Sequence, residues 1–182
     1  MARRKRHKQG NRGRRSDSAR KSPPLSSFNP MTGETLVFAY GSNLSLEQMR
    51  RRCPGARLVC AAALFGYAIE FVGYSRRWAG AVANVRPQRY AHVEGLVFAL
   101  RADDLHALDL CEGHPYVYAR RQMVLRSESG ADIAAQVYVH GDPRQVHQPS
   151  REYLGRIARN YKRQGFAPEA LYHAVREIRE VV

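Results

Sequence analysis

The sequence predicts an α+β fold in which a mixed β-sheet is accompanied by a few helices. Three observations support this. The chain has 182 residues, 44% of them apolar, which is enough for one domain with a real core. Its strand-like segments mostly follow one another along the chain, and its helix-like segments fall between or after them. This order is typical of α+β or barrel-like domains rather than of doubly wound sheets.

The expected strands are apolar stretches that end at turn residues. Residues 36–40 form a short apolar run that Gly41 ends, and residues 57–73 form one long strand or two shorter ones around Gly66. A later strand pair turns at Ser129-Gly130. The expected strands cover residues 36–40, 57–73, 81–85, 92–100, 116–126 and 133–140.

The expected helices are bounded by capping residues. Ser45 and Ser150 occupy N-cap positions, and Gly113 and Gly165 follow the ends of two helices. Pro168 begins the last helix, because proline suits a first turn. The expected helices cover residues 46–52, from Asp103 or Asp104 to 112, 151–162, and from 168 onward.

Positive charge is concentrated at the N-terminus. The formal net charge is +14, and residues 1–22 contain ten of the 30 Lys and Arg residues but one of the 16 acidic residues, a net +9. Residues 1–30 are low in complexity and bury too little apolar area to offset their ordering entropy. We therefore expect a disordered basic tail over 1–30 and a folded domain over 31–182. The tail is either a solvated extension or an arm that binds nucleic acid, and translation from Met31 is a third possibility.

Several classes of protein do not fit the composition. No apolar run reaches the ~20 residues of a membrane span, and the N-terminus has no apolar core of a secretory signal. We therefore expect a cytoplasmic protein with no membrane partner. Cys53, Cys60 and Cys111 form no CxxC pair, and the histidines form no HExxH motif. We expect reduced, buried thiols, no metal site and no cofactor.

The turn Tyr40-Gly41-Ser42-Asn43-Leu44 is the first place where chemistry could occur. Gly41 lets the backbone approach a ligand closely, and a turn that leads into a helix points several N–H groups at one spot. The turn could also merely connect two elements. It is not a phosphate loop, since the Lys and the wider glycine spacing are missing, and Ser42 is not in a GxSxG motif.

Glu112 is the second such place. It comes at the end of an expected helix, just before Gly113. The negative end of the helix dipole disfavours a charged carboxylate there, which tunes the group toward general-base work. The alternative is a surface glutamate beside a C-cap. The pattern alone indicates no more than packing for Tyr118, Tyr138 and Tyr153.

Together the two motifs resemble the gamma-glutamylcyclotransferase superfamily. The loop Phe38–Leu44 follows a short strand, and Leu108-Asp109-x-x-Glu112-Gly113 comes about seventy residues later, as in that family. Three further segments are similar to family segments in the same order: 78–83, 93–98 and 149–153. The resemblance extends over about residues 35–175.

The resemblance implies a small mixed β-barrel flanked by helices, with a pocket at its mouth. It implies that Glu112 is the general acid/base. It further implies that the gamma-glutamyl group is bound by Tyr40, Gly41, Ser42, Asn43, Leu44 and Ser45, with Tyr118, Tyr138 and Tyr153 near the pocket. Tyr116 is an alternative to Tyr118.

The implied reaction releases 5-oxoproline from a gamma-glutamyl amino acid or amine. The substrate's own α-amine attacks its gamma-carbonyl, so this carbon–nitrogen lyase needs no protein nucleophile. The loop resembles the cyclotransferase and gamma-glutamylamine branches of the family more than its glutathione-specific branch. The resemblance therefore implies a role related to glutathione metabolism. The alternative is a non-catalytic module that binds gamma-glutamyl ligands, associated with nucleic acid through residues 1–30. The leaving amine and the oligomeric state remain open.

Overall fold

Five strands and four α-helices make up the part of the chain that the computed structural model describes, residues 33–141 and 147–181. The predicted tail over residues 1–30 lies outside the described residues, so it stays a prediction, as does the domain boundary at residue 31. In chain order the elements are β1 (Thr35–Ala39), the 3-10 helix η2 (Ser42–Leu44), α1 (Leu46–Arg52), β2 (Arg57–Ser75), β3 (Gly80–Leu100), α2 (Ala102–Glu112), β4 (Tyr118–Ser127), β5 (Asp132–His140), α3 (Arg151–Gln164) and α4 (Glu169–Val181).

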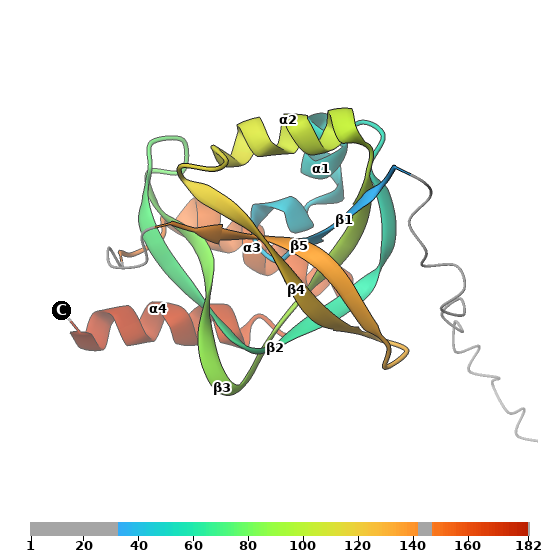
Figure 1. Cartoon of the computed structure of the whole chain (residues 1–182). Coiled ribbons are helices and arrows are strands. Elements are labelled where there is room, and N and C mark those ends of the chain that lie inside the picture. The colour runs from blue at the N-terminus through green and yellow to red at the C-terminus, as the bar shows by residue number, and fades with distance from the viewer. Residues whose placement is uncertain (1–32, 142–146, 182) are drawn as a thin grey trace, which may run out of the picture.

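The strands close into a barrel in the order β1-β3-β2-β4-β5 (Figure 1). The barrel is mixed, because β1 runs antiparallel to β3 and parallel to β5. Val37 shows both relations, since it pairs with Phe98 on one side and with Gln136 on the other. Buried apolar side chains such as Phe38, Leu64 and Phe98 form the core. The predicted α+β class with a small mixed barrel is confirmed.

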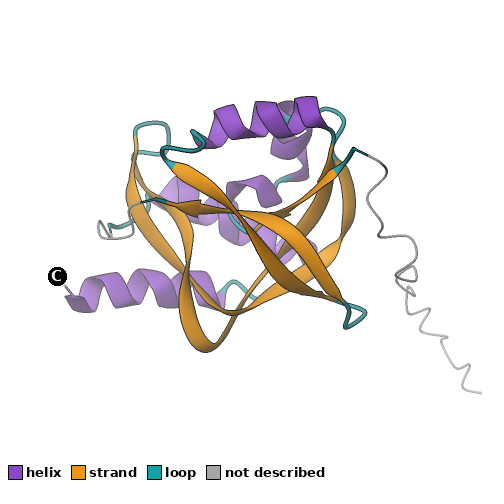
Figure 2. Ribbon diagram, in the orientation of Figure 1, coloured by secondary structure: helices purple, strands orange, loops and turns teal. Residues whose placement is uncertain are grey.

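The long hairpin of β2 and β3 corrects the expected strands. Residues 81–85 and 92–100 belong to one strand of 21 residues, not to two strands. Phe65 pairs with His92 and Tyr67 with Pro87, so residues 88–91 bulge opposite Gly66 alone. These residues were expected to separate two strands. They form a bulge instead, and pairing with β2 continues on either side of it. Both strands bend strongly along the barrel (Figure 2).

The helix ends agree with most of the expected caps. The Ser45 and Ser150 hydroxyls accept hydrogen bonds from the backbone N–H groups of Gln48 and Tyr153 at 3.3 and 3.2 Å. The start of α2 was predicted wrongly. Its N-cap is Arg101, with no side-chain cap, rather than an aspartate. β4 likewise begins at Tyr118, two residues later than expected.

Helix α2 lies across one end of the barrel, beside α1 (Figure 1). Leu108 is fully buried beneath it, but Leu110 and Cys111 are exposed, because only one side of the helix contacts the barrel. The expectation of buried thiols is therefore wrong for Cys111 and only partly right for Cys60, which is half-buried; Cys53 is buried. Among the described residues no helix is long and apolar enough to cross a membrane.

Candidate active site

A small hollow at the mouth of the barrel, beneath the end of α2, brings most of the predicted site residues together. Glu112 lines it beside the loop between β1 and α1 and beside three tyrosines from β4, β5 and α3. The predicted residues that line it are Tyr40, Gly41, Ser42, Asn43, Glu112, Tyr118, Tyr138 and Tyr153. Leu44 and Ser45 are not among the lining residues. Leu44 is buried in the core and Ser45 caps α1, so both support the loop from behind.

The loop leaves three consecutive backbone donors available. The N–H groups of Leu44 and Ser45 donate to the carbonyls of Gly41 and Ser42, at 3.1 and 3.2 Å. Among the described residues, no acceptor pairs with the N–H groups of Gly41, Ser42 or Asn43. Successive unpaired N–H groups in such a turn form a concavity that stabilises negative charge.

Gly41 lies close to two side chains of the opposite wall. A Cβ at Gly41 would lie 3.3 Å from Ala83 Cβ and 3.8 Å from the Tyr153 hydroxyl. Ala83, on β3, also lines the hollow. The absence of a side chain at Gly41 therefore sets the width of the hollow.

Glu112 is held by donors from two other elements. Its Oε1 accepts a hydrogen bond from Asn43 Nδ2 at 2.9 Å and lies 2.8 Å from Arg52 Nη1. The same Arg52 nitrogen donates to Asn43 Oδ1 at 2.8 Å. The side chains of Arg52 and Glu112 are 11% and 14% exposed, so the pair is largely withdrawn from water. A guanidinium and an amide N–H group thus face the carboxylate at the helix end that the sequence emphasised.

Buried tyrosine hydroxyls form the wall of the hollow. Two of these hydroxyls bind the backbone of Ala83. The Tyr118 hydroxyl donates to Ala83 O at 2.7 Å, and the Tyr153 hydroxyl accepts from Ala83 N at 3.1 Å. Tyr40 donates to the Tyr138 carbonyl at 2.6 Å. Burial raises the pKa of all four hydroxyls above their ordinary value, so they are neutral hydrogen-bonding groups.

A second ion pair orients the tyrosine on β5. Tyr138 Oη donates to Asp109 Oδ1 at 2.7 Å, and Arg120 Nε lies 3.1 Å from the same oxygen. Asp109 belongs to the motif on α2, so that motif supplies both Glu112 in the hollow and the acceptor of Tyr138. Tyr116, the alternative to Tyr118, is 92% exposed and does not line the hollow.

Two residues of the site were missed in the sequence. Arg52 ends α1, and Gln48 lies one turn before it. Gln48 Nε2 donates to Ser42 Oγ at 2.9 Å and to Asn43 Oδ1 at 3.2 Å. Ser45, Gln48 and Arg52 are spaced i, i+3 and i+7, which places them on one face of a helix. That spacing was the signal that could have identified them.

The model for the family "Gamma-glutamyl cyclotransferase, AIG2-like" matches residues 37–156, which include the loop, Glu112 and all three of the wall tyrosines on β4, β5 and α3. The chain belongs to this family. A mouse gamma-glutamylcyclotransferase is 30% identical over 143 residues, covering 75% of this chain and 76% of the mouse protein. The human gamma-glutamylcyclotransferase is 28% identical over 139 residues, covering 74% and 73% of the two chains.

Solved structures agree with the family. A structure named gamma-glutamyl cyclotransferase superposes with a TM-score of 0.71 at 26% identity, covering 78% of this chain and 86% of its own. A yeast gamma-glutamyl cyclotransferase specific to glutathione has a TM-score of 0.57 at 13% identity, covering 80% and 96%. At that identity, the yeast protein shows a shared fold alone.

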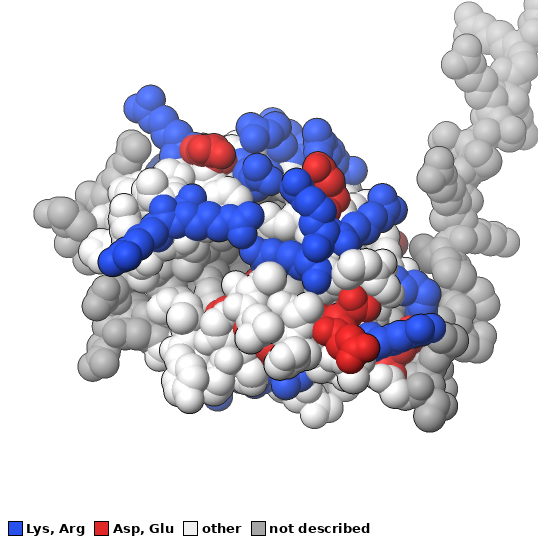
Figure 3. Space-filling model, turned by 90° about the horizontal axis from the view of Figure 1, so that it is seen from above, with Lys and Arg blue, Asp and Glu red and all other residues white. Residues whose placement is uncertain are grey.

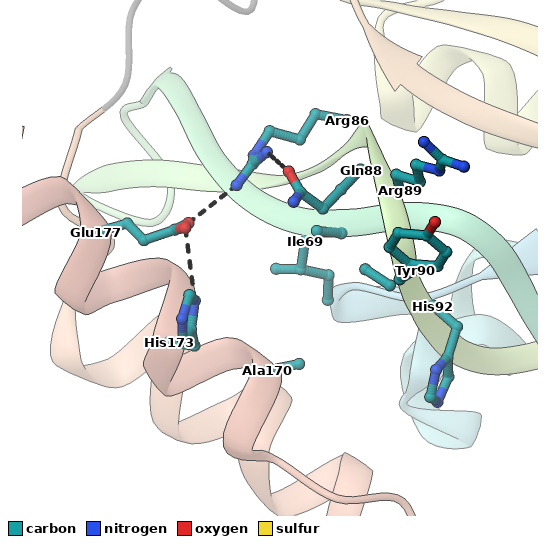
Figure 4. Close-up of a pocket in the computed structure, with 11 residues that line it drawn as sticks. Ile69, Arg86, Gln88, Arg89, Tyr90, His92, Ala170, His173 and Glu177 are labelled. Atoms are coloured by element: carbon teal, nitrogen blue, oxygen red, sulfur yellow. Dashed lines mark hydrogen bonds and ion pairs between the residues drawn. The ribbon is translucent and has the colours of Figure 1, made fainter.

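A second, larger hollow of about 290 Å³ lies between β3 and α4 (Figure 4). Arg86 from β3 faces Glu177 from α4 across it, with Nη2 and Oε2 3.0 Å apart. The bulge forms part of its wall, with Arg89 stacked at 4.7 Å over the exposed ring of Tyr90. None of the predicted site residues lines it. Among the described residues, no group of three or more His, Cys, Asp and Glu could hold a metal ion.

Proposed function

We infer that this chain is a gamma-glutamyl cyclotransferase that releases 5-oxoproline from a gamma-glutamyl amino acid or amine. The observation that carries the inference is the position of Glu112. A carboxylate lies in a tyrosine-walled hollow, beside three unpaired backbone N–H groups, in a chain that belongs to the cyclotransferase family. The curated relatives carry that activity in their names.

The reaction is an intramolecular aminolysis. The α-amine of the substrate attacks its own gamma-carbonyl carbon, and a new C–N bond closes the five-membered ring. Glu112 takes a proton from the attacking amine and passes it to the leaving amine as the original amide bond breaks. Holding the substrate with its α-amine against its gamma-carbonyl gives effective molarities of about 10⁵ M or more. The proton transfers contribute roughly 10² to 10⁴ in rate.

The loop holds the negative charge of the substrate. The N–H groups of Gly41, Ser42 and Asn43 bind its α-carboxylate or the oxygen that becomes negative in the transition state. Seen from the side of α2, Lys and Arg side chains gather over much of the surface (Figure 3). A positive surface raises the local concentration of an anionic substrate.

Cys53 and Cys60 do not act as nucleophiles. Cys53 is beside Arg52, but burial raises the pKa of its thiol to about 12, and the negative charge of Asp104 adds to this. Burial likewise raises the pKa of Cys60 to about 11. Both are therefore protonated at neutral pH, whereas the thiolate is the nucleophilic form. A reaction in which the substrate supplies its own nucleophile agrees with this.

Release of 5-oxoproline from a panel of substrates tests the proposal. The panel contains gamma-glutamyl amino acids, gamma-glutamyl amines and glutathione, each incubated with the full chain. We expect release from an amino acid or amine conjugate, and less from glutathione, because of the Ala-Tyr-Gly-Ser-Asn loop. A folded protein that binds these compounds and releases nothing would instead be a ligand-binding module. Nucleic-acid binding by the tail and a cytoplasmic location stay predictions.

A further inference from the structure

Arg52 and Glu112 are each the last residue of a helix, α1 and α2, and the two helix ends meet above the hollow. The contact between them involves only one of the two carboxylate oxygens. Oε1 receives both Arg52 Nη1, at 2.8 Å, and Asn43 Nδ2, at 2.9 Å. Among the described residues, Oε2 of Glu112 has no hydrogen-bond partner.

The direction of these hydrogen bonds is fixed by chemistry. A guanidinium has donors and no acceptor, so the Asn43 atom 2.8 Å from Arg52 must be the amide oxygen. The amide nitrogen of Asn43 therefore faces Glu112 and donates to it. Gln48 must in turn present its own nitrogen to Asn43 Oδ1. Gln48 and Arg52 thus donate to Asn43, and Asn43 and Arg52 donate to Oε1 of Glu112.

We propose that Arg52 is a positioning residue of the proposed cyclotransferase reaction, which locks Oε1 of Glu112 and leaves Oε2 as the atom that transfers the proton. Two donors already occupy Oε1, so a proton there would face a donor and repel it. Oε2 accepts the proton that the attacking α-amine loses as the ring C–N bond forms. The same oxygen then returns that proton to the leaving amine as the amide C–N bond breaks, so Glu112 ends as it began.

Arg52 also acts on the carboxylate through its charge. Its guanidinium lies against Glu112 while both side chains are largely withdrawn from water, so Arg52 controls the electrostatic field at the carboxylate. Asn43 couples this control to the loop that binds the substrate.

The other groups around Glu112 leave Arg52 as its main electrostatic partner. Four tyrosines face it, one from the loop after β1 and the others from β4, β5 and α3, and burial raises the pKa of each, so they stay neutral. The Cys53 thiol is neutral as well. Asp109, on the same helix, is paired with Arg120 of β4 at 3.1 Å, so their charges largely cancel. Arg52 is the cation in direct contact with Glu112.

The variant Arg52→Met tests the proposal, because it removes the charge and keeps most of the apolar stem. We expect kcat to fall roughly 10- to 100-fold, a part of the acid/base contribution, while KM changes less than about threefold. The acidic limb of the pH–rate profile moves to higher pH, because a cation beside the carboxylate has been removed. Arg52→Lys keeps the limb near its wild-type position. Arg51→Met is the matched control, since Arg51 is on the same helix but is exposed and pairs with Glu47.

A second readout does not depend on turnover. In protein carrying ¹³C-labelled glutamate, the Glu112 carboxyl signal, assigned by its loss in Glu112→Gln, reports ionisation directly. We expect its titration midpoint to rise in Arg52→Met and to stay unchanged in Arg51→Met. If wild-type protein releases no 5-oxoproline yet this midpoint moves, the proposed function fails and the effect of Arg52 on the carboxylate stands.

The proposal is overturned if Arg52→Met keeps the wild-type kcat and pH profile, or if the midpoint does not move. A purely structural role for Arg52 gives a third pattern, in which Arg52→Met lowers the folded fraction while the folded enzyme keeps its pH profile. That pattern also contradicts the proposal. If Arg52→Met does not fold, Arg52→Gln is measured in its place, and the same two results decide.

Discussion

Two Arg–Glu pairs in this molecule have nearly the same geometry and very different surroundings. Arg52 and Glu112 approach to 2.8 Å at the mouth of the barrel, with side chains 11% and 14% exposed. Arg86 and Glu177 approach to 3.0 Å in the hollow between β3 and α4, but are 32% and 42% exposed. Water screens the second pair and solvates both partners, so it contributes about 0 to 1 kcal/mol.

The difference lies in what each carboxylate can do. Among the described residues, one oxygen of Glu112 has no hydrogen-bond partner, and Glu112 lines a narrow hollow together with neutral tyrosines. Both Glu177 oxygens have a partner, since His173 Nδ1 lies 3.7 Å from Oε1, and the surrounding space is wide and wet. The larger hollow is therefore the less suited to chemistry, and the convergence of polar groups matters more than volume.

Neutralising the two glutamates is the strongest way to test this contrast. Glu112→Gln keeps the shape and the Asn43 contact but cannot carry a proton, so kcat should fall by roughly 10² to 10⁴. Glu177→Gln should leave kcat within about twofold, as expected for an exposed pair. Steady-state release of 5-oxoproline measures both. Comparable losses in the two variants would erase the distinction between the hollows.

Widening or narrowing the small hollow should have the next largest effect. In Gly41→Ala the new Cβ would sit 3.3 Å from Ala83 Cβ, so the loop must shift by a few tenths of an ångström. Such a displacement of binding groups should lower kcat/KM roughly tenfold. Ala83→Gly in the same chain removes the opposing methyl and should restore part of the loss. Full activity of Gly41→Ala alone would show that the loop does not set the width.

Removing the Tyr138 hydroxyl should have a smaller effect. Tyr138→Phe removes the 2.7 Å hydrogen bond to Asp109, while Arg120 still holds that carboxylate. We expect a loss of about 1 kcal/mol in stability and a kcat reduced by no more than about tenfold. Urea unfolding and turnover assays measure the two. Tyr116→Phe, at a 92% exposed position, serves as the control and should change neither.

The buried Glu70 gives the smallest expected effect, which is on stability alone. Burial raises the pKa of Glu70, although Asn84, Arg86 and His140 act in the opposite direction. A raised pKa means that folding favours the neutral form, so this contribution is present at low pH and is lost as pH rises through the folded-state pKa. Glu70→Gln keeps the neutral form at every pH.

The melting temperature of Glu70→Gln relative to wild type should therefore increase as pH rises from about 4 to about 8, starting near the ordinary glutamate value. Glu177→Gln, whose carboxylate is half exposed, should show a flat difference over the same range. A relative stability of Glu70→Gln that falls with increasing pH would mean that Asn84 and Arg86 outweigh burial.

The sequence indicated the chemistry of the site better than its electrostatics. The loop and Glu112 stand out because glycine, asparagine and a glutamate before a helix-ending glycine have few reasons to occur together. Arg52 was missed because three arginines end α1, and sequence alone does not say which one turns inward. Only the position of α2, set by the barrel, brings Glu112 against the last of them.

The fold was predicted at the level of class and missed in places where tertiary pairing overrides local pattern. The segment 86–91 was not expected to be part of a strand, yet Arg86 and Pro87 pair with β2 and residues 88–91 form a bulge within one strand. Cys111 was expected to be buried, as were the other two thiols. Helical spacing gives the face of a helix but not how far the barrel beneath it extends.

The central claim is that the α-amine of the substrate, not water, is the group that displaces the leaving amine in the hollow beneath α2. Turnover of a gamma-glutamyl amine in H₂¹⁸O, with mass spectrometry of the product, tests this most directly. We expect 5-oxoproline that carries no ¹⁸O, in an amount equal to the amine released. Glutamate carrying ¹⁸O would show that water attacks the gamma-carbonyl, and would contradict the account.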